Sequence, residues 1–92
     1  MKAEKRNKVQ IYFDILQILC EESKHEKSNL TKVAHLANLP YDRFQKCLNH
    51  LVQIGMVDRG KDGKMFVTEK GLEYVDECAK FNKFLAKMGL LP

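Results

Sequence analysis

The chain has 92 residues, with 45% hydrophobic and 30% charged side chains and a formal net charge of +4 at pH 7. This composition is typical of one globular domain with enough chain for a small core. It excludes a membrane-spanning segment, because no apolar run is long enough to cross a bilayer, and no signal-peptide pattern is expected at the start; the basic charge permits nucleic-acid binding without requiring it.

The first predicted helix runs from about Asn7 to Ser23 and carries more apolar surface than a surface helix needs. Two apolar stripes predict burial on two sides, either within the domain or against a partner. Val9, Tyr12, Phe13, Leu16, Leu19 and Cys20 form one stripe, and Ile11, Ile15 and Ile18 form the other. The basic segment Met1–Lys8 before the helix is either a solvated end or an arm that touches phosphates.

A short second helix and a tight turn come next. Lys24–Asn29 is polar and predicts a loop, and the Thr31 hydroxyl is the expected N-cap of a helix over Lys32–Ala37. The residues expected to turn inward are Val33, Leu36 and Ala37. Pro40 favours extended geometry in the residue before it and so ends this helix.

The third predicted helix, from about Tyr41 to Ile54, has one apolar stripe and a polar remainder. The stripe consists of Phe44, Leu48, Leu51 and Val52. Gly55 is expected to stop the helix, because glycine enters the left-handed conformation without steric cost. The second helix, the turn and the third helix together predict a helix-turn-helix.

A β-hairpin is predicted directly after this helix. One strand starts at Met56, the other is Met65–Val67, and Asp62–Gly63 between them is typical of a two-residue hairpin turn. Lysines lie on both sides of this turn. A helix-turn-helix followed at once by a basic-tipped hairpin predicts a winged helix-turn-helix, a mainly α fold with a small β-hairpin.

The last predicted helix is capped by Thr68 and runs from Glu69 to about Met88, with Gly89 and Pro92 ending it. One apolar side is expected to close the domain core and contains Leu72, Val75, Ala79 and Ala86. A second set follows the alternating steps of four and three that are typical of a coiled-coil seam, and would lie in water in a monomer. This second set is Tyr74, Cys78, Phe81, Leu85 and Met88.

The charges of the last helix also bear on assembly. Acidic residues crowd its first half and lysines its second half. This order suits the helix dipole, and it equally suits an antiparallel pairing of two copies. We therefore predict a homodimer through this helix, with residues 1–68 as the winged helix-turn-helix domain and 69–92 as the dimerisation helix. A monomer with an apolar tail is the alternative.

No pattern for metal binding or catalysis is present in the sequence. The cysteines and histidines lack the spacing of metal-ligand motifs, and there is no phosphate-binding glycine loop, nucleophile elbow or carboxylate pair. The residues concerned are Cys20, Cys47, Cys78, His25, His35 and His50. We expect buried, reduced thiols in a cytoplasmic protein, with no metal, no cofactor and no enzymatic activity.

The chain resembles, in three segments, the small archaeal winged-helix DNA-binding proteins of the family that includes the ten-kilodalton Sulfolobus chromatin protein. The segments lie within about Val9–Val75 and read VQIYFDILQIL, ANLPYDRFQKCLNHLVQIGMV and FVTEKGLEYV. The second segment is the most specific of the three. The resemblance implies a winged-helix fold, DNA binding, a dimer held through the last helix, and association with the nucleoid.

The third helix and the hairpin are the expected contacts to double-stranded DNA. In a helix-turn-helix the second helix of the motif enters the major groove. The expected contacts are Tyr41, Arg43, Gln45, Lys46, Asn49 and His50 from the helix, and Arg59, Lys61 and Lys64 from the hairpin. Cationic side chains can donate to guanine edges or phosphates, and the amides can pair with adenine edges. Asp42 is expected to stabilise the helix N-terminus instead.

Two other functions fit the same fold, because a fold does not determine a function. The polar, basic third helix favours DNA, whereas the surplus apolar stripes of the first and last helices favour a protein partner. A homodimer would satisfy those stripes, and a protein–protein interaction module that does not bind DNA is the main alternative. A ligand-responsive regulator with an apolar pocket between the first and last helices is the third possibility.

Overall fold

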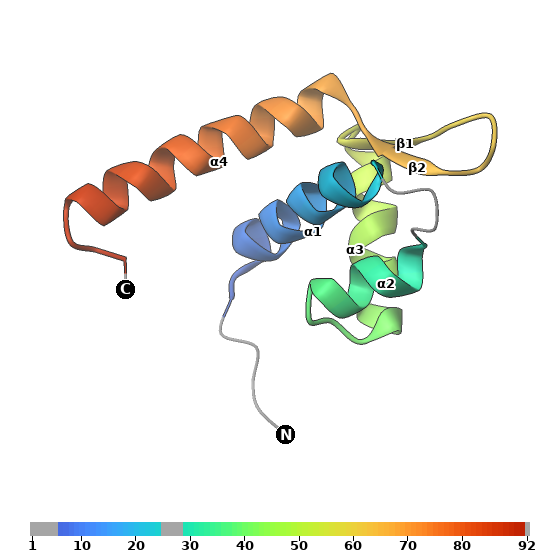
Figure 1. Cartoon of the computed structure of the whole chain (residues 1–92), viewed down its shortest axis with the longest axis horizontal. Helices are drawn as coiled ribbons and strands as arrows, with labels where there is room; N and C mark the ends of the chain where they lie inside the picture. The colour runs from blue at the N-terminus through green and yellow to red at the C-terminus, as the bar shows by residue number, and fades with distance from the viewer. Residues whose placement is uncertain (1–5, 25–28, 92) are drawn as a thin grey trace.

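The computed structural model describes residues 6–24 and 29–91. In chain order, its elements are α1 (Lys8–Glu22), α2 (Leu30–Leu36), α3 (Tyr41–Gln53), β1 (Val57–Arg59), β2 (Met65–Val67) and α4 (Glu69–Lys87). Figure 1 shows α1, α2 and α3 gathered together, with the hairpin at one edge and α4 extending past the end of α1. The predicted mainly α fold with a small β-hairpin is confirmed.

The core lies between the first three helices and the hairpin. Its largest fully buried side chains are Ile15, Leu16, Val33, Phe44, Leu51 and Val57. α1 packs against α2, α4 and β2, so the predicted burial of this helix on more than one side is confirmed. The prediction is wrong for Leu36 and Val52, which are exposed. α2 instead buries Ala34, and Val52 lies at the edge of the buried stripe of α3.

The first turn of α2 begins earlier than predicted. The Asn29 side-chain oxygen accepts a hydrogen bond from the Lys32 N–H at 2.8 Å, and α2 starts at Leu30. Asn29 is therefore the N-cap, and the predicted cap, Thr31, lies within the helix. The prediction is wrong because asparagine caps a helix at least as well as threonine does.

The turn between α2 and α3 depends on one left-handed residue. Asn38 has φ 58°, and its N–H donates to the His35 carbonyl at 3.0 Å. The N–H of Leu39 donates to the Ala34 carbonyl at 3.0 Å, and the Leu39 side chain is buried. These bonds satisfy the last carbonyls of α2 and direct the chain into α3. Gly55, with φ 82°, ends α3 as predicted.

The hairpin loop is longer than predicted. β1 and β2 pair antiparallel. The Gly60 N–H donates to the Lys64 carbonyl at 2.8 Å, and the Gly63 N–H donates to the Gly60 carbonyl at 3.0 Å. Gly63 has φ 82°. This is a three-residue loop with a left-handed glycine, so the predicted two-residue turn is wrong, although the same glycine supplies the unusual conformation.

The start of α4 is tied to the end of α3. The Thr68 hydroxyl donates to the Gly55 carbonyl at 2.6 Å, and the Thr68 N–H donates to the Met56 carbonyl at 3.0 Å. The Lys70 ammonium donates to the Ile54 carbonyl at 2.6 Å. Thr68 also caps α4, as predicted. These bonds fix the direction in which α4 leaves the hairpin.

Gly71 lets α4 approach the hairpin closely. A Cβ at this position would overlap the Met56 carbonyl oxygen and lie 2.6 Å from Val67 Cγ1. We expect Gly71→Ala to lower the free energy of unfolding by about 1–3 kcal/mol, because overpacking outweighs the gain in helix propensity. Urea denaturation measures the change. Glu73→Ala, on an exposed side of the same helix, is the control, and a Gly71→Ala variant as stable as the wild type would contradict the prediction.

α4 turns a different face to the rest of the molecule from the one predicted. Val75 packs against the core, but Leu72 is 50% exposed. The other two residues predicted to close the core are also exposed: Ala79 and Ala86. The physical reason is the close contact of Gly71 with the hairpin. This contact turns the side of α4 that carries Gly71 and Val75 toward α1, and the side that carries Leu72 away from it.

The residues of the predicted coiled-coil seam consequently differ in their exposure within one protomer. The Tyr74 hydroxyl donates to the Val9 carbonyl at 2.6 Å, and burial raises the pKa of Tyr74 to about 12, so the donor stays protonated. The prediction that the whole seam lies in water in one protomer is thus wrong for Tyr74. The remaining members are half-buried (Cys78 and Leu85) or exposed (Phe81 and Met88).

Candidate nucleic-acid interface

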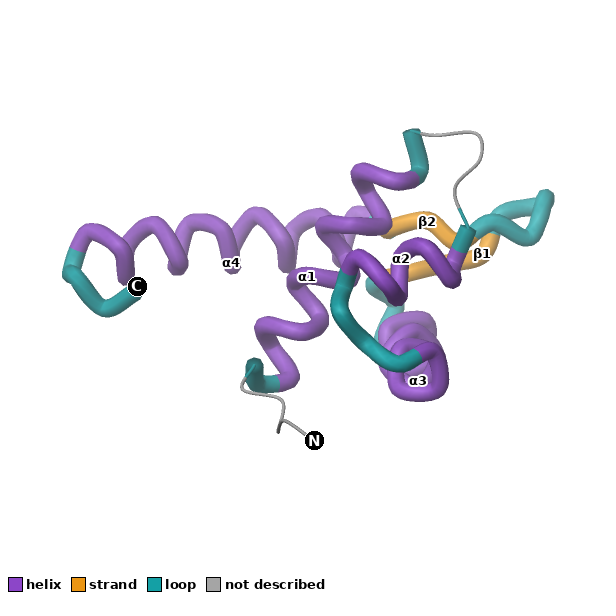
Figure 2. Tube along the Cα trace, turned by 60° about the horizontal axis from the view of Figure 1, so that its bottom comes forward, coloured by secondary structure: helices purple, strands orange, loops and turns teal. Residues whose placement is uncertain are grey.

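The outward face of α3 is exposed and is not covered by any other described element. Figure 2 views α3 almost along its axis, with the other helices on one side of it. At about 100° per residue, the side opposite the buried stripe carries Asp42, Lys46, Asn49 and Gln53, all of them exposed. This face is polar and combines one cation, one carboxylate and two amides.

A second set of α3 residues faces the start of α1. Arg43, Cys47 and His50 recur at steps of four and three, which keeps them on one flank of the helix. Nδ1 of His50 lies 2.6 Å from the hydroxyl of Tyr12. Burial raises the pKa of Tyr12, so its hydroxyl stays protonated. This bond ties α3 to α1.

The opposite flank of α3 holds Tyr41 and Gln45. The side-chain amide of Gln45 donates to the Tyr41 hydroxyl at 2.6 Å. The Tyr41 ring lies against Phe44, with ring centroids 6.1 Å apart. The residues predicted to touch DNA therefore fall on three sides of α3. Lys46 and Asn49 point outward, and the other four lie on the two flanks.

The start of α1 adds cations that lie beside α3. The Arg6 guanidinium donates to Asp14 Oδ2 at 2.7 Å and to the Ala37 carbonyl at 2.9 Å. The Lys8 ammonium lies 5.5 Å from the centroid of the Tyr12 ring. Both basic side chains are thereby held at the helix-turn-helix. The other lysines of the basic N-terminal segment, Lys2 and Lys5, lie outside the described residues.

The hairpin carries three exposed cations: Arg59, Lys61 and Lys64. Two aspartates lie among them and accept backbone hydrogen bonds. Asp58 Oδ1 accepts from the Arg59 N–H at 2.8 Å, and Asp62 Oδ1 accepts from the Lys64 N–H at 3.0 Å. These carboxylates support the hairpin backbone while reducing its positive charge.

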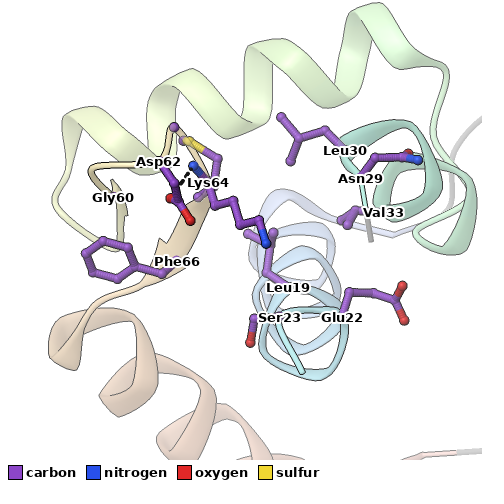
Figure 3. Close-up of a pocket in the computed structure, with 12 residues that line it drawn as sticks. Leu19, Glu22, Ser23, Asn29, Leu30, Val33, Gly60, Asp62, Lys64 and Phe66 are labelled. Atoms are coloured by element: carbon purple, nitrogen blue, oxygen red, sulfur yellow. Dashed lines mark hydrogen bonds between the residues drawn. The ribbon is translucent and has the colours of Figure 1, made fainter. Parts of the chain in front are cut away.

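A cleft of about 400 Å³ separates the hairpin loop from the end of α1 and the start of α2. Figure 3 shows Leu19 and Val33 on the helical wall and the Lys64 side chain extending across the opening. The buried Glu22 carboxylate lies at the same wall, with the Lys32 ammonium 3.1 Å from Oε1 in an ion pair that lacks hydrogen-bond geometry. Both lysines of the loop, Lys61 and Lys64, are exposed, and Lys64 lines the cleft.

A family model for winged helix-turn-helix proteins matches residues 5–86 of the chain. The chain belongs to the winged helix-turn-helix family. Among solved structures it is similar to Sso10a-2, described as a DNA-binding protein from Sulfolobus solfataricus, with 31% identity, a TM-score of 0.67, and coverage of 90% of this chain and 85% of that chain. No curated protein matches the chain significantly. The resemblance proposed from the sequence is confirmed.

In this winged helix, α3 is the second helix of the helix-turn-helix, the position called the recognition helix in this fold, and the wing consists of β1, β2 and the loop Gly60–Lys64. The sequence-based set of DNA contacts leaves out Gln53, although helical periodicity extended by one turn from Asn49 places it on the same outward face. It could not place Lys8 beside α3, because that placement depends on a contact between distant segments.

Residues 6–24 and 29–91 contain neither a metal-ligand cluster nor a membrane-spanning helix. No group of three or more histidine, cysteine, aspartate or glutamate side chains there could hold a metal ion. None of the helices described there combines the length and the apolar character of a membrane span. His25 lies outside the described residues.

Proposed function

We propose that this protein binds double-stranded DNA as a homodimer and acts as a transcriptional regulator or a chromatin-associated protein. The recognition helix would enter the major groove, and the wing would contact the flanking backbone. The observation that carries the proposal is the outward face of α3, which is polar and exposed and has cations beside it. The similarity to Sso10a-2, itself described as a DNA-binding protein, supports it.

The outward residues have the chemistry that base edges require. Lys46 can donate to guanine or to a phosphate, and the amides of Asn49 and Gln53 can pair with adenine. Asp42 lies in the first turn of α3, where its charge complements the helix dipole and repels phosphates. We therefore assign base contacts to the amides and a positioning role to Lys46.

The flank residues are assigned to the backbone. The phosphates of both strands border the major groove, so a helix inside it meets them on its flanks. Arg43 and His50 lie toward α1, and Tyr41 and Gln45 lie on the other flank. The wing cations would reach the backbone or the minor groove beyond the recognition helix.

The dimer would be held through α4. Phe81 and Phe84 are 59% and 53% exposed, with ring centroids 6.4 Å apart, and Met88 is exposed beside them. A groove of about 350 Å³ between α1 and α4 is lined by Cys78 and Leu85 of the predicted seam. The acidic start and basic end of α4 favour antiparallel pairing with a second copy.

Removing two cations of the recognition helix tests the proposal. We expect Arg43→Ala combined with Lys46→Ala to weaken binding to duplex DNA, because each lost phosphate contact makes the slope of log K against log salt less negative by about 0.9. Fluorescence anisotropy with a labelled duplex, measured across a salt series, gives both affinity and slope. Thermal stability should change little, since both side chains are exposed.

The matched control is Arg43→Lys combined with Lys46→Arg, which changes the same two side chains of α3 but keeps both positive charges. If the alanine variant binds DNA with the affinity and salt slope of the control, the assignment of Arg43 and Lys46 fails.

A protein–protein interaction module is the second candidate, favoured by the exposed apolar residues of α4. The wild-type protein distinguishes the two functions. A dimer that shows no affinity for any duplex at about 50 mM salt, where phosphate contacts are strongest, would favour the interaction module.

A further inference from the structure

A shallow hollow lies between the start of α1 and the recognition helix. It measures about 270 Å³ and is lined by Arg6, Lys8, Ile11, Tyr12, Arg43 and Cys47. Three of these side chains are cations, and none is a carboxylate. The Arg43 and Lys8 charges both act to lower the pKa of the Cys47 thiol, against the larger raising effect of burial. Lys8, Arg43 and Cys47 all line the same hollow.

Two cations of the hollow, Arg6 and Lys8, are positioned by contacts with the fold. Arg6 is anchored at Asp14 and at the Ala37 carbonyl, so its charge is largely neutralised. Lys8 lies over the Tyr12 ring, and Tyr12 is bonded to His50 of α3. Within the described part of the chain, Lys8 makes no ion pair. Its ammonium is thus held beside α3 and available to an anion.

The hollow borders the face of α3 that would enter the groove. Arg43 and Cys47 belong to the flank adjacent to the outward residue Lys46. The major groove is about 12 Å wide and close to the width of one helix. A strand that borders the groove on this side would therefore pass over the hollow.

We propose that the start of α1 is a third DNA-contacting element, in which Lys8 and Arg43 together hold one backbone phosphate of the strand bordering the recognition helix. The proposal rests on the proposed function and deepens it by naming the phosphodiester group that this surface binds. Arg6 is a positioning residue, since its bonds to Asp14 and Ala37 hold the start of α1 on the helix-turn-helix.

Lys8→Gln is the decisive variant, because it removes the charge and keeps a stem that can lie over Tyr12. We expect the salt slope of duplex binding to become less negative by about 0.9 per protomer, with affinity reduced roughly 5- to 10-fold per contact at 0.1 M salt. Lys8→Arg should retain the wild-type slope. Because Lys8→Arg keeps the positive charge at the same position, it is the matched control.

The outcomes separate this inference from the function on which it rests. A wild-type protein without affinity for duplex DNA overturns the proposed function, and this inference with it. A wild-type protein that binds DNA, together with a folded Lys8→Gln variant whose affinity and slope equal those of Lys8→Arg, overturns only the third contact. Circular dichroism and a thermal melt confirm that each variant is folded.

Discussion

Phe44→Ala should lower the free energy of unfolding by about 3–5 kcal/mol, the largest stability effect that we expect in this chain. The Phe44 side chain is 0% exposed and belongs to the stripe that holds the recognition helix against the core. Truncating it leaves a cavity that the surrounding side chains can fill only in part. For a domain of this size, a loss of this magnitude is a large fraction of the total stability. Urea denaturation, followed by circular dichroism, measures it.

Phe66→Ala is the matched control for this prediction. Phe66 lies on the outer side of the wing, opposite Asp58 in the strand pairing, and is 44% exposed. The same chemical change there should cost about 1 kcal/mol or less, because little buried surface is lost. Equal losses of stability for the two variants would show that Phe44 does not anchor α3 as described.

Phe81→Glu combined with Phe84→Glu should convert a dimer into a monomer. Both rings are more than half exposed in the protomer, so the substitutions leave its core intact. In the proposed dimer they would bury carboxylates without partners, which is strongly unfavourable. Light scattering coupled to size exclusion should give about twice 10.7 kDa for the wild type and 10.7 kDa for the variant. DNA affinity should also fall by roughly 10²- to 10⁴-fold, because the two recognition helices are no longer linked.

Ala79→Glu combined with Ala86→Glu is the control for the dimer. It adds the same two negative charges to the same helix, at exposed positions on a different side. It should remain dimeric. A wild-type protein of 10.7 kDa at micromolar concentration, or a phenylalanine variant that stays dimeric, would remove α4 as the dimer interface.

Local sequence signals predicted the helical part of the fold well. Phe44, Leu48 and Leu51 recur at helical spacing, and Gly55 ends α3. Both features depend on residues within one or two turns of each other, which a sequence displays directly. Thr31 was wrongly chosen as a cap because Asn29 competes with it over the same short distance, and residue preference alone does not separate two good caps.

Long-range contacts explain what the sequence could not predict. The side of α4 that faces the body depends on the close contact between Gly71 and the hairpin, and periodicity alone offers two apolar sides without choosing between them. The bond between Tyr12 and His50 joins residues that are 38 positions apart. Such pairs arise only after the helices pack, so the basic hollow at the start of α1 has no signature in the sequence beyond its charges.

The hydrogen-bonded joint between α3 and α4 has a consequence for target sites. Because Thr68 and Lys70 bond the start of α4 to the Gly55 and Ile54 carbonyls directly after α3, each recognition helix and its α4 should move as one rigid unit. In a two-fold assembly held through α4, the crossing angle of the paired helices would then set both the centre-to-centre distance and the rotational phase of the two half-sites. Duplexes whose half-sites are offset by whole turns, about 10–10.5 base pairs each, would be bound by both recognition helices at once. Duplexes whose half-sites are offset by half a turn would be bound by only one recognition helix.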